Sequence, residues 1–235
     1  MTDLVRVVAE CTHRAGLLPM FEKQLADAGI PLFLDIVPPY EGGVRRLGAY
    51  LKHLHGMLDR YGDCKKLIIA DAWDMLFYGT AEEVYAKVPR DMVLMGAERN
   101  CWPDASLAPY YPGNTPWRFL NSGLMASSPD YFADWFAMIE KCEAYHPGFI
   151  DQQWFSHRYL DKSLPMELDT ETDLGYCMFL EAGEMQPVDG RPHNILTGTF
   201  PNFVHFNGKH DSTLFLWKLA TSCASSLQSL ATQDS

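Results

Sequence analysis

Two aspartates three positions apart directly follow an apolar run in the first third of the chain. The run Leu67–Ala70 is followed by Asp71, and Asp74 comes after Ala72 and Trp73. If the chain turns here at the end of a strand, both carboxylates can point at one ion. Mg²⁺ and Mn²⁺ prefer such oxygen ligands and leave coordination positions open to phosphate oxygens. The alternative is a plain turn whose aspartates accept hydrogen bonds from backbone amides, which is the commoner use of an isolated D-x-x-D.

A histidine close to the other end of the chain has the chemistry to complete such a site. His205 lies between two aromatic residues and is soon followed by Asn207-Gly208-Lys209. A neutral imidazole is a suitable third ligand for Mn²⁺ in an oxygen-rich site. Gly208 would let the backbone approach a phosphate closely, and Lys209 could neutralise that phosphate as a point charge. The alternative is a hairpin turn at Asn-Gly with a hydrogen-bonded structural histidine.

Three further segments combine polar and aromatic residues. They are Gly96–Asp104, which contains Glu98 and Trp102; Trp117–Gly123, which contains Asn121 and Ser122; and Ile150–Trp154, which contains Asp151. An exposed tryptophan can stack on a sugar or a base, and small polar side chains can hydrogen-bond to hydroxyl groups. Asp151 is a candidate catalytic carboxylate. The structural alternatives are a loop held by a buried tryptophan, a strand that leads into a turn, and a helix N-cap.

The elements that must position these residues alternate between strand and helix over the first hundred residues. Apolar periodicity predicts strands at Leu4–Ala9, Pro31–Val37, Lys66–Ala70 and Asp91–Ala97, and helices over Leu18–Ala28, Leu47–Tyr61 and Ala81–Lys87. This alternation predicts an α/β fold with a mostly parallel central sheet flanked by helices. Such sheets bind ligands beyond the carboxyl ends of their strands, and residues 71–74 and 97–104 follow two of those ends.

The second half of the chain is less regular. We predict a loop over Asn100–Trp117, a helix from Ser128-Pro129, a short helix over Asp151–Tyr159, a loop over Gly183–Thr199 and a terminal helix over Leu214–Leu230. There is no internal repeat and no linker-like stretch. We therefore predict one domain over residues 1–235, with a C-terminal tail that frays from about residue 222.

Composition narrows the class of protein. The 235 residues are 47% hydrophobic and 21% charged, as in ordinary globular proteins. The net charge of −11 disfavours broad binding to a phosphate backbone.

No apolar run approaches the roughly 18 residues of a membrane span, and the start Met1-Thr2-Asp3 does not have the pattern of a signal peptide. Six scattered cysteines without a C-x-x-C pair argue against a zinc cluster. We expect a cytoplasmic protein that does not bind membranes.

The order of the polar segments is more specific than any one of them. Along the chain stand DxxD, AExxCWPD, RFLNSG, DQxxFxxxYLD, LD and HxNGK. This series resembles the glycosyltransferase domain of the procollagen galactosyl- and glucosyltransferases, which include the lysyl hydroxylase family. The resemblance extends from about Leu4 to about Lys209.

The resemblance implies a GT-A fold, a nucleotide-sugar donor that is usually UDP-linked, and Mn²⁺, with Mg²⁺ as a possible substitute. By position, the resemblance implies that Asp71, Asp74 and His205 are the metal ligands. It implies that Trp73 stacks on uracil and that Gly208 and Lys209 contact the diphosphate. It places Trp102 near the sugar and the acceptor, and Asn121, Ser122 and Asp151 around the donor sugar. We also assign Glu98 to donor binding, and Arg45 or Arg46 to neutralising the diphosphate. Asp151 and Asn121, with Trp102, form the predicted catalytic group.

One departure from the family pattern leaves the stereochemistry of transfer open. The family has an acidic run before the glutamine, but here Ile150 replaces one carboxylate and only Asp151 remains. In an inverting route, Asp151 would deprotonate the acceptor hydroxyl. In a retaining route, it would instead stabilise the oxocarbenium-like sugar.

The acceptor also stays open at this stage. A protein hydroxylysine, a glycan and a hydroxymethylated DNA base all present a suitable hydroxyl. We see neither a hydroxylase domain nor a secretory signal, and expect a cytoplasmic microbial or viral enzyme; the acidic balance weighs modestly against DNA. Two other function classes remain: a non-catalytic binder of nucleotide-sugars or glycans, and a metal-dependent phosphotransferase or nuclease. The last usually requires additional acids clustered at the metal.

Overall fold

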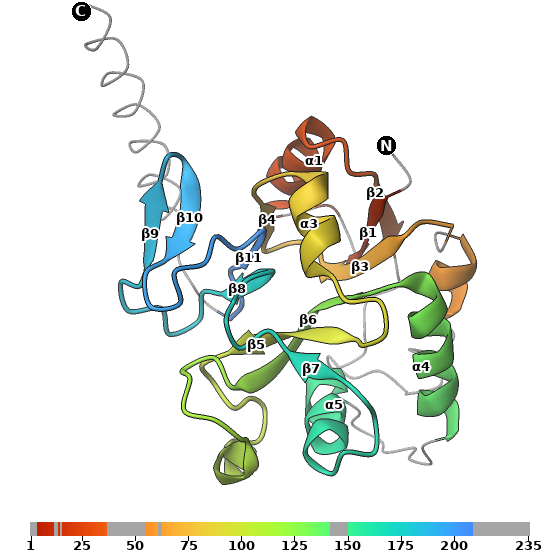
Figure 1. The fold of residues 1–235 in the computed structure, drawn as a ribbon, viewed down its shortest axis with the longest axis vertical. Helices are drawn as coiled ribbons and strands as arrows, with labels where there is room; N and C mark the ends of the chain where they lie inside the picture. Colours follow the sequence, from red (N-terminus) through yellow and green to blue (C-terminus); the bar gives the residue numbers. More distant parts are fainter. Residues whose placement is uncertain are drawn as a thin grey trace, which may run out of the picture.

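The computed structural model describes residues 4–11, 14, 16–36, 55–60, 63–141 and 150–208 (Figure 1). Several predictions therefore lie outside the described residues: the loop that contains Arg45, most of the helix predicted over Leu47–Tyr61, Lys209, and the terminal helix and tail. Residues 55–60 are helical, as that predicted helix requires.

A six-stranded sheet with the strand order β2-β1-β3-β6-β5-β7 forms the centre of the molecule. Its strands are β1 (Val5–Cys11), β2 (Leu32–Ile36), β3 (Lys66–Asp71), β5 (Leu94–Glu98), β6 (Phe119–Ser127) and β7 (Glu167–Leu168). β1 pairs in parallel with β2 and β3, and β5 pairs in parallel with β7. β6 runs antiparallel between β3 and β5. The predicted α/β fold with a mostly parallel sheet is confirmed, and β6 is the reversed strand within it.

Helices cover both faces of this sheet. They are α1 (Leu18–Asp27), α3 (Ala81–Lys87), α4 (Pro129–Lys141) and α5 (Asp151–Leu160). α1 and α3 lie on one side, and α4 and α5 lie on the other (Figure 1). Alternate residues of β3 serve the two cores, because successive side chains of a strand point to opposite faces. Ile68 packs in the same core as Phe21 of α1, whereas Leu67 and Ile69 pack with Trp135 of α4.

Local sequence signals fix two of the helices where we predicted them. α3 begins with a capping box, in which Thr80 Oγ1 accepts from Glu83 N at 3.2 Å and Glu83 Oε2 accepts from Thr80 N at 3.0 Å. α4 begins after Ser128, whose Oγ accepts from Tyr131 N at 3.3 Å. Because these signals depend only on neighbouring residues, the predicted starts agree with the structure.

A second, three-stranded sheet packs beside the first one. Its strands are β4 (Met75–Phe77), β11 (Phe203–His205) and β8 (Gly175–Cys177). β11 lies between the other two, antiparallel to β4 and parallel to β8. The loop that leads into β8 is held by Asp169, whose buried carboxylate accepts from the amides of Asp173, Leu174 and Gly175 at 2.7–2.9 Å. This small sheet brings residues 75 and 205 together although 130 positions separate them in the chain.

Two predicted loops contain regular structure, so those predictions are wrong in part. The segment Gly183–Thr199 contains a hairpin of β9 (Met185–Val188) and β10 (Arg191–Asn194). Its turn residues Asp189 and Gly190 have φ angles of 50° and 75°, as a type I′ turn requires. Both strands contain a proline, a residue that usually argues against a strand. The segment Asn100–Trp117 contains a 3₁₀ helix over Ala105–Tyr110.

No helix among the residues that the structure describes is both long enough and apolar enough to cross a membrane.

Candidate functional site

Asp71, Asp74 and His205 come together at the junction of the two sheets. Asp71 is the last residue of β3, Asp74 directly precedes β4, and His205 is the last residue of β11. One ligand atom from each side chain lies within 4.8 Å of the other two. His205 Nε2 lies 3.4 Å from Asp71 Oδ2 and 3.3 Å from Asp74 Oδ1. Two carboxylates and one imidazole are donors that suit Mn²⁺ or Mg²⁺. The exposed Asp71 side chain leaves the group open on one side.

Strand pairing and a braced turn set this arrangement. His205 pairs with Met75 across the β4–β11 ladder, and Phe206 N donates to the carbonyl of Asp74 at 2.7 Å. The turn between the two aspartates is held from α1, since Leu17 N donates to the carbonyl of Trp73 at 2.6 Å. Glycine is required beside this contact: Gly16 has a φ of +61°, and a Cβ there would lie 2.3 Å from the Trp73 oxygen.

The buried histidine and its aspartate partner stabilise each other's charge. Burial alone would lower the pKa of His205, but its hydrogen bond to Asp74 raises that pKa well above its usual range. Burial would by itself raise the pKa of Asp74, but the same contact with His205 lowers it. The contact between them therefore favours the charged form of each group. A divalent cation bound here would replace the proton on Nε2.

The other ring nitrogen of the histidine is held by an amide. His205 Nδ1 lies 3.2 Å from Asn121 Oδ1 and 3.8 Å from the sulfur of Cys177. An amide oxygen can only accept, so we assign the proton to Nδ1, which leaves the Nε2 lone pair for a metal. Burial raises the pKa of Cys177 to about 11, so this neighbour stays a neutral thiol at physiological pH.

Glu98, the last residue of β5, joins several of the sequence motifs. Its carboxylate is buried and accepts from Asn121 Nδ2 at 2.9 Å, from Gln152 Nε2 at 2.7 Å and from Asn207 Nδ2 at 3.0 Å. Burial raises the pKa of Glu98, and these amide donors oppose that rise. We predicted that Glu98 binds the nucleotide-sugar donor. Its contacts in the structure are to the protein's own amides, and donor binding by Glu98 stays a prediction.

The segment Asn121–Gly123 lies in a bulge of β6 and not in a turn at the end of a strand, which was the structural alternative for it. Consecutive residues Met95 and Gly96 of β5 pair with Met125 and Asn121, so the register shifts at this point. Side chains satisfy the displaced amides: Ser122 N donates to Gln152 Oε1 at 3.3 Å, and Gly123 N donates to Asn121 Oδ1 at 3.0 Å. Bulges are common beside active sites because they redirect side chains.

The remaining predicted site residues differ in how much of their surface is exposed. Trp73 and Trp102 are partly exposed, at 38% and 50%, and Ser122 and Asp151 are half-buried. Asp151 is the first residue of α5, and its N-cap is Ile150, so the N-cap alternative for Asp151 is wrong. Gly208 has a φ of +73°, and a Cβ there would lie 2.7 Å from the ring of Phe179. Arg45 and Lys209 lie outside the described residues.

The structure also assigns contacts to three residues for which the sequence suggested no role. Gln152 and Asn207 donate hydrogen bonds to Glu98. Gly123 faces the candidate metal group, which consists of Asp71, Asp74 and His205. Each of the three is the direct neighbour of a predicted site residue: Gln152 of Asp151, Asn207 of Gly208, and Gly123 of Ser122. The only sequence signal for them was their place in the same motifs as these neighbours.

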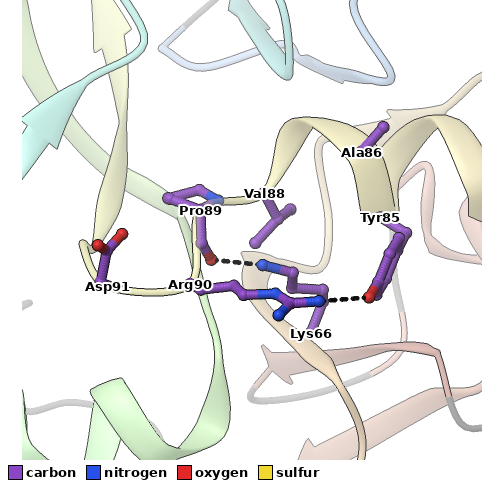
Figure 2. A pocket seen from close by; sticks show the side chains of 7 residues that line it. All are labelled: Lys66, Tyr85, Ala86, Val88, Pro89, Arg90 and Asp91. Atoms are coloured by element: carbon purple, nitrogen blue, oxygen red, sulfur yellow. Dashed lines mark hydrogen bonds between the residues drawn. The ribbon is translucent and has the colours of Figure 1, made fainter.

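A pocket at the opposite end of β3 does not belong to this centre (Figure 2). It is lined by Lys66, by Tyr85 and Ala86 of α3, and by residues 88–91, which follow that helix. Lys66 Nζ donates to the Pro89 carbonyl at 2.8 Å, and Arg90 donates to the hydroxyl of Tyr85 at 3.0 Å. Lys66 begins the strand that Asp71 ends, so this pocket is roughly 16 Å from the metal group at about 3.3 Å per residue.

Comparison with known proteins identifies relatives over most of the chain. The family model of the PLOD GT domain matches residues 39–220. A multifunctional procollagen lysine hydroxylase and glycosyltransferase of Caenorhabditis elegans is 31% identical over an alignment that covers 91% of this chain and 32% of that protein. The uncharacterized protein R699 of Acanthamoeba polyphaga mimivirus is 28% identical over 68% of this chain and 35% of that protein. The chain thus spans about a third of the length of these relatives.

A solved structure has the same fold with little sequence identity. It is a glycosyltransferase involved in the glycosylation of the major capsid of PBCV-1, with a TM-score of 0.54 at 10% identity. The match covers 88% of this chain and 95% of that one. The central sheet with its helices is therefore a GT-A-like glycosyltransferase fold.

Gly123 gives a direct test of the metal group. A Cβ at this position would lie 2.3 Å from His205 Cε1 and 2.7 Å from Asp71 Oδ2, so Gly123→Ala must displace at least one of these two side chains. We expect its affinity for Mn²⁺, measured by calorimetry, to fall by at least ~10-fold. Gly56→Ala is the control, since a Cβ there meets nothing closer than 3.8 Å. Equal Mn²⁺ affinity in both variants would contradict the assignment.

Proposed function

The chain belongs to the PLOD GT domain family, and on that premise we propose that it transfers a sugar from a nucleotide-sugar to a hydroxyl group with the help of a divalent cation. The observation that carries this proposal is the Asp71, Asp74 and His205 group beyond the end of β3. We propose Mn²⁺ as the cation, with Mg²⁺ as a substitute, and a UDP-sugar as the donor.

The donor would bind with its diphosphate at the three ligands. A cation held by Asp71, Asp74 and His205 would act as a Lewis acid and stabilise the negative charge that develops on the diphosphate when the sugar–phosphate bond breaks. Trp73 lies between the two aspartates in the chain and is partly exposed, which supports its assignment to uracil stacking. Gly208 is assigned to close approach of the backbone to the diphosphate. Lys209 and Arg45 are proposed to add positive charge there.

The sugar and the acceptor would lie on the side of β6 and α5. Asp151 is half-buried at the start of α5, and Trp102 exposes half of its surface. We propose Asp151 as the carboxylate that deprotonates the acceptor or stabilises the reacting sugar, and Trp102 as a stacking surface. Ser122 and Asn121 are proposed to line the donor sugar. The present contacts of Asn121, to Glu98 and His205, support a positioning role for it as well.

For the acceptor, we propose the hydroxyl of a protein hydroxylysine. This proposal is supported by the nematode relative, which is described as a multifunctional procollagen lysine hydroxylase and glycosyltransferase and is 31% identical to this chain. Glycans and hydroxymethylated DNA bases are the alternatives. A panel of these three acceptors separates them.

Metal-dependent turnover tests the proposed function. We expect UDP release from UDP-galactose or UDP-glucose that requires Mn²⁺ and increases with the correct acceptor. Asp71→Ala and His205→Ala should lose on the order of 100-fold or more of this activity, because each removes one metal ligand. Asp161→Ala and His193→Ala are the controls, since both residues lie outside the metal group. UDP binding without any turnover in the wild type would instead indicate a non-catalytic binder.

The role of Asp151 has its own test. Asp151→Asn keeps the size of the side chain but removes its charge, so we expect the transfer rate to fall by ~100-fold or more while the affinity for UDP with Mn²⁺ stays unchanged. Asp130→Asn removes the matching first-turn aspartate of α4 and serves as the control. Wild-type transfer by Asp151→Asn, measured with the same donor and acceptor, would exclude the proposed role.

A further inference from the structure

We infer that Gln152 is a positioning residue that holds the sugar and acceptor side of the site in place without acting on the metal group. The inference rests on the proposed sugar transfer and deepens it. Gln152 is the second residue of α5 and is 5% exposed. It follows Asp151 directly, so whatever fixes Gln152 also fixes the backbone that carries the proposed catalytic carboxylate.

The side-chain amide of Gln152 connects three separate segments. Its Nε2 donates to Glu98 Oε1 at 2.7 Å and to the carbonyl of Trp102 at 3.1 Å. Its Oε1 accepts from Ser122 N at 3.3 Å. The first contact anchors α5 to the end of β5, the second holds the loop that presents the exposed Trp102, and the third holds the bulge of β6. Trp102, Ser122 and Asp151 are thereby fixed relative to one another.

Only an amide of this length satisfies all three contacts. A primary amide has two N–H donors and an acceptor oxygen, and Gln152 uses each of them here. A glutamate would face the carboxylate of Glu98 and the carbonyl of Trp102 with oxygens that cannot donate when ionised. An alanine would leave the Ser122 amide, which the register shift has taken out of the β5 ladder, without this acceptor.

The connections of Glu98 separate this role from metal binding. Asn121 and Gln152 both donate to Glu98 Oε1. Asn121 continues to Nδ1 of the metal ligand His205, whereas Gln152 continues to Trp102 and Ser122. Loss of the Gln152 amide should therefore disturb the sugar and acceptor residues and leave the metal ligands in place. A misplacement of about 1 Å at reacting groups can cost on the order of 100-fold in rate.

The test compares Gln152→Ala and Gln152→Glu with Gln153→Ala. Gln153 is the next residue of the same helix and is half-buried, so it matches the change in residue type. We expect both Gln152 variants to lower kcat for Mn²⁺-dependent UDP release from UDP-galactose or UDP-glucose by ~10- to 100-fold. Their Kd for UDP in the presence of Mn²⁺, measured by calorimetry, should stay within about 2-fold of wild type, because the metal ligands are untouched.

A structural readout accompanies the kinetics. Hydrogen exchange at the Ser122 amide should become faster in Gln152→Ala and stay unchanged in Gln153→Ala, because only the first variant removes its acceptor. If Gln152→Ala fails to fold, Gln152→Glu, which keeps the size of the side chain, decides the outcome.

Three results would overturn the inference. A kcat like that of Gln153→Ala would show that Gln152 positions nothing needed for the reaction. A loss of UDP–Mn²⁺ affinity as large as the loss of kcat would show that it acts through the metal group. Absence of Mn²⁺-dependent UDP release in the wild type would remove the proposed function and this inference with it, whereas an active wild type with unaffected Gln152 variants would remove only the inference.

Discussion

A carboxylate buried away from water must be surrounded by hydrogen-bond donors, and the site depends on how Glu98 meets that requirement. Amides of Asn121, Gln152 and Asn207 supply the donors, from β6, from α5 and from the segment after β11. These three segments are far apart in the chain, and Glu98 is the acceptor that they share. A shared charged acceptor fixes their relative positions, because loss of any one donor leaves the buried carboxylate with fewer hydrogen bonds. Such a loss destabilises the folded protein.

From Glu98 two sets of contacts extend in different directions. Through Asn121 the network reaches the imidazole of His205, which strand pairing places beside Asp74. Through Gln152 it reaches the carbonyl of Trp102 and the bulge at Ser122. The candidate metal ligand His205 and the segments of Trp102 and Ser122 are thus connected to one buried carboxylate through two different amides. A glycosyltransferase needs this relation, since the leaving diphosphate and the attacking hydroxyl must both be held at the same sugar carbon.

The sequence predicted those parts of the fold and site that short-range patterns determine. The residue pattern of Ala81–Lys87 predicted α3, the serine at Ser128 predicted the start of α4, and the apolar run before Asp71 predicted β3. The three candidate metal ligands could be named because their motifs occur in a family order, although 131 positions separate Asp74 from His205. The resemblance, rather than spacing, supplied that pairing.

What the sequence could not predict depends on contacts between distant segments. The reversed direction of β6 and its register shift follow from pairing with β3 and β5, which no local pattern encodes. Gln152 and Gln153 are both glutamines, so the sequence does not distinguish them. Only the fold shows that Gln152 is buried against Glu98, whereas Gln153 is half-buried. The hairpin of β9 and β10 was missed because prolines, which usually exclude strand, stand in both of its strands.

The central claim is that Asp71, Asp74 and His205 hold the cation that binds the diphosphate of the donor. The most direct measurement is an anomalous difference map from crystals of the protein with Mn²⁺ and UDP. We predict a manganese peak bound by one carboxylate oxygen of each aspartate, by His205 Nε2 and by the diphosphate, with Nδ1 still facing Asn121. A manganese peak bound by other residues, or UDP bound at this position without a peak, would contradict the claim.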